Sequence, residues 1–292
     1  MNLNGKPTQD LVEDWMSLTT GAVHYSKACD EQFSRVDYPH LRMIFKRMKD
    51  KGLVDSVVGR DGYYEWVGDV AQPLDWQNLP DTGDSGLILP FDLRDYVFIY
   101  PDTVIVVAGS KSSGKTGFLY RTIAMNIAND NFEHIELLTN LEGGLALLRD
   151  RFNSMDIKIP QPAPFTVRNV NDKFHVYIKQ RNTIYVIDYI DAPEGTDFYL
   201  IAAQIKKIDQ RLQGLNSVAI VGLQKPMMRD IGFGGEQTMK NASLYIALDS
   251  KKLKIVDAKV PADNLTHPKN MTFEFSYSEA GTNFTNIKTT WV

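Results

Sequence analysis

The sequence contains almost no cysteine and no long hydrophobic run. Its only cysteine, Cys29, cannot form an internal disulfide, and one thiol cannot supply a Cys-x-x-Cys metal site. No stretch approaches the roughly 18 consecutive apolar residues of a membrane-spanning helix, and the first residues lack the basic-then-apolar pattern of a signal peptide. We therefore expect a cytoplasmic protein that has no membrane as a partner.

An excess of charge of one sign is also lacking. Lysine and arginine number 32, aspartate and glutamate number 36, and the formal net charge is −4. This balance excludes a protein that coats nucleic acid through its overall field, so that any contact with DNA has to be local. A hydrophobic content of 43% over 292 residues is typical of a folded globular protein, and at about 150 residues per domain the length predicts two domains.

The stretch 69–90 separates two parts of different character. It holds three prolines and two glycines, and it shows no helical periodicity. We predict an N-terminal domain over residues 1–68, a linker over 69–90 and a larger domain over 91–292.

The N-terminal part is predicted to contain three short helices followed by a β-hairpin. The helices are expected from Thr8 to about Gly21, over 24–33 and over 37–52, where Asp37 can cap the third helix. The extended runs LVDSVV and YYEWV then flank a glycine-containing turn at 59–62, which is typical of a hairpin. This order resembles a winged helix-turn-helix domain, which is a small α+β fold.

Four cations make this part a candidate for contact with duplex DNA. Arg42, Lys46 and Lys49, the basic stripe, recur at helical spacing opposite the apolar face of the third helix, and Arg60 lies in the hairpin turn. A basic helix face is also common on ordinary solvated surfaces, and winged helices also dock on proteins. Because residues 1–70 contain nine basic and eleven acidic side chains, both alternatives stay open.

The most specific motif begins at the end of an apolar run that starts at Thr103. A glycine-rich turn and a helical pattern follow that run, which is the context of a P-loop. Eight residues match the pattern GxxxxGK[ST]: Gly109, Ser110, Lys111, Ser112, Ser113, Gly114, Lys115 and Thr116. Small residues let successive backbone N–H groups point at phosphates, and the helix adds its positive end. The motif predicts that Lys115 reaches the β- and γ-phosphates of ATP and that Thr116 binds Mg²⁺.

Two carboxylates follow predicted strands. Asp188 ends the buried-strand pattern that begins at Thr183 and is the best candidate for holding Mg²⁺, with Asp191 as its competitor. Glu142 lies just beyond the predicted strand 134–140, where a carboxylate can orient and deprotonate the water that attacks the γ-phosphate. A glutamate that stabilises the start of the next helix would have the same position, and the residues alone do not decide between the two roles.

Together these motifs resemble the RecA/DnaB-type ATPases over about residues 89–284. The segments LLTNLEGGLALLRDRF and VIDYID are similar to the corresponding segments of that family. The resemblance implies a RecA-like α/β fold with a mainly parallel sheet, in which the strand 218–224 lies between the P-loop strand and the strand ending at Asp188. It also implies roles for three residues: Glu142 as catalytic base, Asp188 as the Mg²⁺ residue and Gln224 as the sensor of the γ-phosphate.

The resemblance further implies two DNA-binding loops and a residue that acts on a neighbouring subunit. The loop 191–198 is acidic, whereas the loop 225–240 has flexible glycines, Arg229 and Phe233, whose ring is suited to stacking on a base. An ordinary surface loop is the alternative for the second loop. Lys259 corresponds to the cation that a neighbour contributes to the γ-phosphate, and a solvated lysine at a strand end fits that position equally well.

From these motifs we expect an oligomeric ATPase, in a ring or a filament, that acts on DNA. The first hypothesis is a helicase-like or recombination motor of a phage, plasmid or mobile element, with single-stranded DNA at the ATPase core and duplex DNA at the winged helix. The alternative is an ATP-gated DNA-binding or assembly protein, such as a loader, mediator or regulator, which does not unwind DNA. A P-loop kinase or transferase is disfavoured because the sequence has no arginine-rich lid segment.

Overall fold

A computed structural model of the chain describes residues 7–17, 19, 21–28, 37–67, 77, 83–191, 199–227, 229–262, 266–278 and 281–291. The chain divides into two compact units, Met1–Leu79 and Pro80–Val292, and the described residues of each unit form their own hydrophobic core. The division falls inside the stretch 69–90.

In the part of the smaller unit that the structure describes, two helices pack against a three-stranded antiparallel sheet. The elements are α1 (Gln9–Ser17), β1 (Val23–His24), the 3-10 turn η1 (Tyr25–Lys27), α2 (Tyr38–Asp50), β2 (Val54–Ser56) and β3 (Tyr63–Trp66), with strand order β1-β3-β2. Helix α2 begins where the Asp37 carboxylate accepts a hydrogen bond from the His40 N–H. Apolar residues at helical spacing form the core: Val12, Met16, Leu41, Ile44, Phe45 and Met48.

The second predicted helix of this unit differs from the structure. His24 lies in β1, paired with Tyr63, and only Tyr25–Lys27 is helical, as a single 3-10 turn. Pairing of β1 with β3 therefore takes precedence over the local helical pattern. The remainder of the predicted helix, from residue 29 onward, lies outside the described residues. The hairpin of β2 and β3 is present, with its turn at 57–62.

The larger unit is built around one sheet. Its elements are η2 (Pro90–Asp95), β4 (Thr103–Gly109), α3 (Lys115–Asn126), β5 (His134–Thr139), α4 (Gly144–Asn153), β6 (Thr166–Asn169), η3 (Phe174–Tyr177), β7 (Thr183–Ile190), α5 (Tyr199–Leu212), β8 (Val218–Gln224), η4 (Gly235–Thr238), β9 (Ala242–Asp249), β10 (Lys252–Ala258), β11 (Thr272–Tyr277) and β12 (Phe284–Thr290). The described residues give nine strands in the order β12-β11-β10-β9-β4-β8-β7-β5-β6.

The sheet combines a parallel part and an antiparallel part. Strands β9, β4, β8, β7, β5 and β6 are parallel, and β10, β11 and β12 extend the sheet antiparallel from β9. Strand β8 lies between β4 and β7, as the resemblance implies. A mainly parallel sheet with helices on its faces, as predicted, is therefore confirmed.

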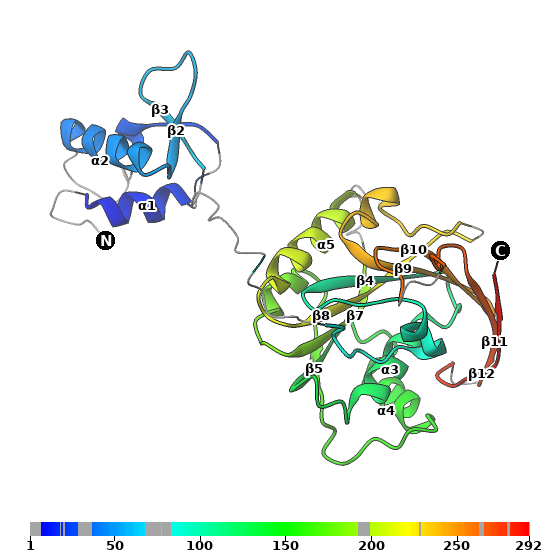
Figure 1. Cartoon of the computed structure of the whole chain (residues 1–292). Coiled ribbons are helices and arrows are strands. Elements are labelled where there is room, and N and C mark those ends of the chain that lie inside the picture. The colour runs from blue at the N-terminus through cyan, green and yellow to red at the C-terminus, as the bar shows by residue number, and fades with distance from the viewer. Residues whose placement is uncertain are drawn as a thin grey trace. The chain divides into compact units, whose positions relative to one another are not determined.

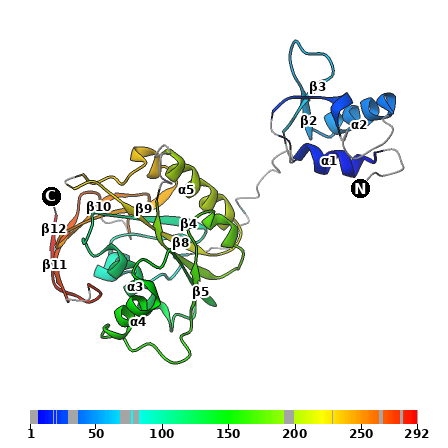
Figure 2. The same ribbon diagram turned by 180° about the vertical axis from the view of Figure 1, so that it is seen from behind.

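Helices cover both faces of this sheet. Helices α3 and α4 lie on one face and α5 lies on the other, and the two opposite views agree (Figures 1 and 2). Alternate residues of β4 supply the two resulting cores, with Ile105 and Val107 in one and Val104 and Val106 in the other. Because both faces are buried, β4 has the continuous apolar sequence from which it was predicted.

Part of the predicted linker belongs to the larger unit. Leu87 and Leu89 are buried in the core that contains α3. The Asn126 side chain accepts a hydrogen bond from the Ile88 N–H at 3.0 Å and donates one to the Ile88 carbonyl at 2.7 Å. Residues 83–90 are therefore held against the end of α3 by packing and hydrogen bonds, which their lack of helical periodicity did not indicate.

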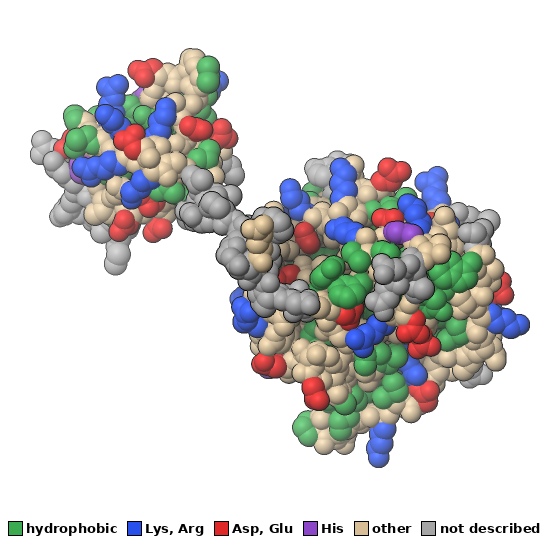
Figure 3. Space-filling view, viewed as in Figure 1, with side chains coloured by type: hydrophobic (Ala, Val, Ile, Leu, Met, Phe, Trp, Pro, Cys, Tyr) green, Lys and Arg blue, Asp and Glu red, His purple; other side chains and the backbone are tan. Residues whose placement is uncertain are grey.

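The surface carries charges of both signs. In the view of Figure 3, basic and acidic side chains are interspersed on the larger unit, and several basic side chains gather over α2 on the smaller one. This mixture agrees with the net charge of −4. Among the described residues, no helix combines the length and apolar character needed to cross a lipid bilayer.

Candidate nucleotide site

The parallel strands bring the predicted site residues to one edge of the sheet. Gly109 at the end of β4 is in register with Gln224 at the end of β8, and Asp188 of β7 is in register with Thr139 at the end of β5. A cavity of about 840 Å³ opens at this carboxyl edge. Its lining comes from the P-loop, α4, β7, β8 and the C-terminal hairpin: Ser110, Lys111, Ser112, Ser113, Gly114, Lys115, Thr116, Gly117, Glu142, Gly143, Leu147, Arg151, Tyr189, Gln224, Tyr277 and Gly281.

The P-loop forms a cradle that requires small residues. Gly114 has φ +92°, a left-handed conformation that favours glycine. A Cβ on Gly109 would come within 2.6 Å of the Ser113 Oγ and 2.9 Å of the Lys115 Cβ. The Ser113 Oγ is buried and makes no hydrogen bond within the described residues. A tight loop with an unsatisfied hydroxyl at the start of a helix fits the binding of phosphate groups.

Lys115 lies inside the cavity wall rather than in solvent. Its side chain comes from the first turn of α3, and its Nζ lies 3.9 Å from the centroid of the Tyr189 ring. Burial lowers the pKa of the Lys115 ammonium from its ordinary 10.5 to about 8, and the negative charges of Asp188, Glu142 and Asp191 oppose part of this shift. The cation is thus held partly desolvated, and phosphate oxygens beside the Nζ would stabilise its charged form.

Thr116 and Asp188 form the pair of oxygen donors that the sequence predicts for a metal ion. The Thr116 hydroxyl donates a hydrogen bond to the Asp188 carboxylate at 3.3 Å. Burial raises the pKa of Asp188, and the positive charge of Lys115 counteracts this rise. Asp191 is exposed and lies beyond the end of β7, so the geometry favours Asp188 for this role. A hydroxyl and a carboxylate are the donors that Mg²⁺ prefers.

Glu142 occupies a tight turn and not the first turn of a helix. The turn is closed by a hydrogen bond from the Gly144 N–H to the Leu141 carbonyl at 2.7 Å, and α4 begins only at Gly144. Leu141 and Gly143 on either side of Glu142 have positive φ values of 54° and 83°. This conformation places the exposed Glu142 carboxylate at the cavity, where its negative charge favours the charged form of Lys115.

Two cavity residues were not predicted to have a role. Tyr189 lies near the end of β7, and its side chain is only half-buried, with its ring against the Lys115 Nζ. Burial raises the pKa of Tyr189, so its hydroxyl stays protonated. Arg151 lies two helical turns into α4 and lines the cavity, where its charge acts on Asp188. Leu147 also lines the cavity and lies four residues before Arg151 on the same face of α4.

The C-terminal hairpin β11–β12 forms one wall of this cavity. The Tyr277 hydroxyl at the end of β11 donates a hydrogen bond to the Ser112 carbonyl in the P-loop at 3.2 Å. A Cβ on Gly117 of α3 would come within 1.7 Å of the Gly281 carbonyl oxygen, so the hairpin turn packs directly on the P-loop helix. Residues 279 and 280 of this turn lie outside the described residues.

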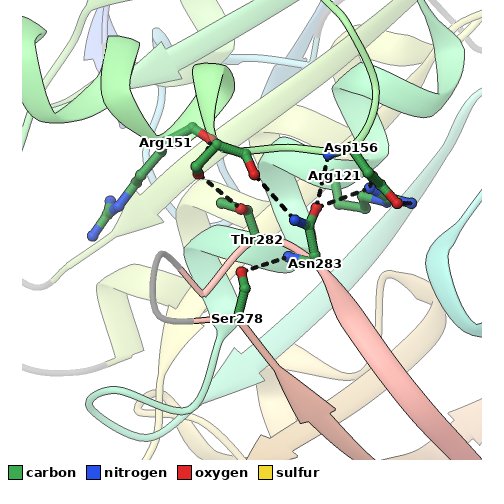
Figure 4. A network of polar contacts seen from close by, with 7 residues as sticks. Arg121, Arg151, Asp156, Ser278, Thr282 and Asn283 are labelled. Carbon is green, nitrogen blue, oxygen red and sulfur yellow. Dashed lines mark hydrogen bonds and ion pairs between the residues drawn. The ribbon is translucent and has the colours of Figure 1, made fainter.

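Hydrogen bonds fasten the hairpin to both helices beneath it (Figure 4). The Asn283 Oδ1 accepts hydrogen bonds from Arg121 of α3 and from the Asp156 N–H, both at 3.2 Å. The Asn283 Nδ2 donates to the Ser154 carbonyl at 3.0 Å, and Arg121 also forms an ion pair with Asp156. The strand pair at the far edge of the sheet is therefore tied to the helices that carry the P-loop and follow Glu142.

The two candidate residues of the loop 225–240 differ in exposure. Phe233 is half-buried and packs against the core on the α5 side. Arg229 is exposed, as a nucleic-acid contact would need. The first predicted loop, from residue 192 to 198, lies outside the described residues.

Lys259 is exposed and lies away from the cavity of its own chain. Its N–H donates to the Ser243 carbonyl, and Ser243 lies beside Val104 at the start of β4. The P-loop begins five residues later at Gly109, which corresponds to about 16 Å along a strand. Lys259 therefore cannot complete the site in its own chain.

The cations of the smaller unit lie on its surface. Arg42, Lys46 and Lys49 are exposed on α2 and Arg60 is exposed in the hairpin turn. Lys49 donates a hydrogen bond to Ser56 at 2.6 Å, and Arg60 lies over the Tyr63 ring. The basic stripe therefore exists as an exposed feature of one helix face.

The architecture of the larger unit is similar to that of known ATPase structures. A DnaB-like replicative helicase, solved in a study of its interactions with primase, is 14% identical, with a TM-score of 0.50, 70% of this chain covered and 64% of the helicase chain covered. A second solved structure, the ATPase domain of another protein, is 16% identical with the same TM-score, and the match covers 70% of this chain and 90% of that domain. The larger unit has the RecA-like P-loop ATPase fold.

At 14% and 16% sequence identity, these two structures are similar to this chain in fold alone. The RadB recombinase structure is 15% identical over 62% of this chain and 90% of its own, with a TM-score of 0.45. The chain spans less than two thirds of the length of the DnaB-like helicase. No protein-family model matches the sequence, and no curated protein matches it either.

Proposed function

We propose that the protein is a Mg²⁺-dependent ATPase that acts on DNA. The observation that carries this proposal is that the P-loop, Glu142 and Gln224 line one cavity, and that Asp188 is hydrogen-bonded to Thr116 in the wall of that cavity. The P-loop, Asp188 and Glu142 were singled out in separate segments of the sequence and Gln224 by the family resemblance, and the four groups come from four neighbouring parallel strands. A structural glycine turn would not need the three other groups beside it.

Each residue has a part in the proposed reaction. The P-loop N–H groups and Lys115 would bind the phosphates, and Thr116 and Asp188 would hold Mg²⁺, which would neutralise negative charge on the phosphates. Glu142 orients the attacking water and takes its proton. Gln224, at the end of β8, contacts the γ-phosphate and reports its presence to the loop that follows.

The site is proposed to be completed by a second copy of the chain. Lys259 is exposed and about 16 Å from the P-loop level of its own sheet, so only a neighbouring site is open to it. A cation supplied in trans would stabilise the charge of the transferred phosphoryl group. We therefore infer assembly into a ring or a filament.

DNA is proposed as the partner on two grounds. One similar structure is a DnaB-like replicative helicase, and Arg229 is exposed in the loop after Gln224. We further propose that the smaller unit is a winged helix that contacts duplex DNA or a protein through the basic stripe. Its order of elements, with a helix α2 followed by the hairpin β2–β3, supports this proposal.

Two substitutions test the proposed chemistry. Lys115→Ala should abolish binding of a fluorescent ATP analogue, because the buried cation of the phosphate cradle is lost. Glu142→Gln keeps the side-chain volume, so we expect unchanged analogue binding and phosphate release slowed by about 10²- to 10⁴-fold. Glu274→Gln, at an exposed position on β11, is the matched control and should hydrolyse ATP normally. Normal turnover in Glu142→Gln would contradict the assignment of the base.

The alternative function is an ATP-gated binder that assembles on DNA without unwinding it. The packing of Phe233 against the core favours this alternative, because a motor that grips single strands needs exposed stacking groups in its loops. A strand-displacement assay separates the two functions. ATP-dependent unwinding supports the motor, whereas DNA-stimulated assembly without displacement supports the gated binder.

A further inference from the structure

Lys225 is a buried cation that the proposed chemistry does not use. It directly follows Gln224, and its side chain is 0% exposed. The Nζ forms an ion pair with the Asp249 carboxylate at 2.6 Å and donates a hydrogen bond to the Arg229 carbonyl at 2.7 Å. A fully buried ammonium is costly unless such partners hold it, so this arrangement ties the three residues together.

On one side, the Lys225 contacts reach the P-loop. The Lys225 N–H donates to the Gly109 carbonyl at 3.1 Å, at the point where the P-loop begins. Asp249, at the end of β9, also accepts a hydrogen bond from the Ser110 hydroxyl at 3.4 Å. Lys225 and Asp249 therefore flank the first two P-loop residues from the two strands that neighbour β4.

On the other side, the same ammonium closes an exposed turn. Its bond to the Arg229 carbonyl joins the two ends of the turn 225–229, of which residue 228 lies outside the described residues, and the Arg229 N–H donates to the Pro226 carbonyl at 3.4 Å. Met227 is 80% exposed and the Arg229 side chain is exposed. The turn thus presents an apolar and a cationic side chain at the carboxyl edge of the sheet, and Lys225 fixes its shape from below.

We propose that Lys225 is a positioning residue that couples occupancy of the P-loop to the turn 225–229, through Asp249 and the Ser110 hydroxyl. The inference rests on the proposed function and deepens it, because it names the link between the nucleotide and the loop that meets DNA. A shift of the first P-loop residues around a bound phosphate moves Asp249 and the ammonium together, because separating the buried ion pair is costly. The Arg229 backbone follows, and the exposed turn changes its position.

The test measures coupling and not activity alone. The full chain is titrated with a fluorescent single-stranded oligonucleotide, without nucleotide and with a nonhydrolysable ATP analogue, and the ratio of the two dissociation constants is the coupling. For the unsubstituted chain we expect a ratio of at least about fivefold. For Lys225→Met, which keeps the length and removes the charge, we expect a ratio near one. The affinity for the analogue and the hydrolysis rate without DNA should stay within about threefold of the unsubstituted values.

Lys254→Met is the matched control. Lys254 forms an ion pair of 2.8 Å with Asp230, in the same loop as Arg229, and it lies on β10, which is separated from the P-loop strand by β9. The control therefore removes a similar charge pair from the loop and should keep the coupling ratio. If Lys225→Met retains the ratio of the unsubstituted chain, or if Lys254→Met loses it equally, the inference is overturned.

A second variant keeps the inference testable if Lys225→Met does not fold. Asp249→Asn removes the charge of the half-exposed partner of the ion pair and should also lower the coupling ratio. It replaces Lys225→Met if that variant does not show a cooperative thermal transition. A retained ratio in Asp249→Asn then overturns the inference. A ratio of one in the unsubstituted chain would contradict the ATP-dependent action on DNA itself, and the inference with it.

Discussion

Burial of the Lys115 ammonium predicts that nucleotide binding takes up a proton in mildly alkaline solution. The pKa of Lys115 is lowered to about 8 because its side chain is 8% exposed and largely desolvated. Phosphate oxygens beside the Nζ favour the charged form, so binding raises this pKa. At pH 8.5 about a quarter of the Lys115 side chains are charged before binding, and nearly all are charged afterwards. We therefore expect uptake of about three quarters of a proton per site.

The lowered pKa of Lys115 also predicts how the affinity for the nucleotide depends on pH. Below pH 8 Lys115 is charged in both states, so its contribution to affinity does not change with pH. Above pH 8 the unbound protein loses the proton that the bound protein keeps, and affinity falls by up to about tenfold per pH unit. If binding restores the ordinary pKa of 10.5, the total loss corresponds to 2.5 pKa units, or about 3.4 kcal/mol.

Calorimetry provides the measurement. A nonhydrolysable ATP analogue is titrated at pH 8.5 in two buffers that differ in ionisation enthalpy, and the difference in heat gives the number of protons taken up. The phosphates are fully ionised at this pH, because their last pKa lies near 6 to 7, about two units lower. Lys111→Met is the control: Lys111 is an exposed lysine of the same loop, and its removal should leave the uptake in place. Uptake below about a tenth of a proton at pH 8.5 would refute the reasoning.

Two other regions give predictions of defined sign. Gly117→Ala would stabilise an isolated helix by about 1 kcal/mol. In the folded protein the new methyl group would meet the Gly281 carbonyl, and because this clash should outweigh the helix propensity we expect a lower melting temperature and weaker nucleotide binding. A stabilised variant would show that the hairpin does not rest on α3. Replacing the three residues of the basic stripe by alanine should weaken binding of duplex DNA of any sequence. It should also reduce the slope of log affinity against log salt concentration by about one for each cation removed. An unchanged slope would exclude this helix face from the DNA contact.

The parts of the site that the sequence predicted are those that depend on local pattern. The P-loop needs small residues between a buried strand and a helix, and all three signals lie within residues 103–127. Asp188 was found because β7 is buried on both faces and its apolar run stops at the carboxylate. The order of β4, β8 and β7 came from the family resemblance, since no local pattern fixes which parallel strands are neighbours.

The parts that the sequence did not predict depend on contacts between distant segments. Tyr189 lies near the end of the apolar strand β7 and has the pattern of a core residue, yet its ring lies against the Lys115 Nζ. Lys225 has the sequence pattern of a surface lysine, and its burial follows from Asp249, which is 24 residues away. Leu87 and Leu89 lie in a proline- and glycine-containing stretch, and only their packing against α3 makes them part of the larger unit.

Strand β4 connects the two sides of the proposed nucleotide site. It pairs with β8 on one side and β9 on the other, so Gly109 lies between Gln224 and Lys225 in one direction and Leu248 and Asp249 in the other. Beyond β9 the sheet continues through β10 to the hairpin β11–β12, whose turn returns to cover α3. The C-terminal hairpin and the P-loop therefore both line the cavity, and an isolated P-loop segment of this chain would lack the wall formed by Tyr277 and Gly281.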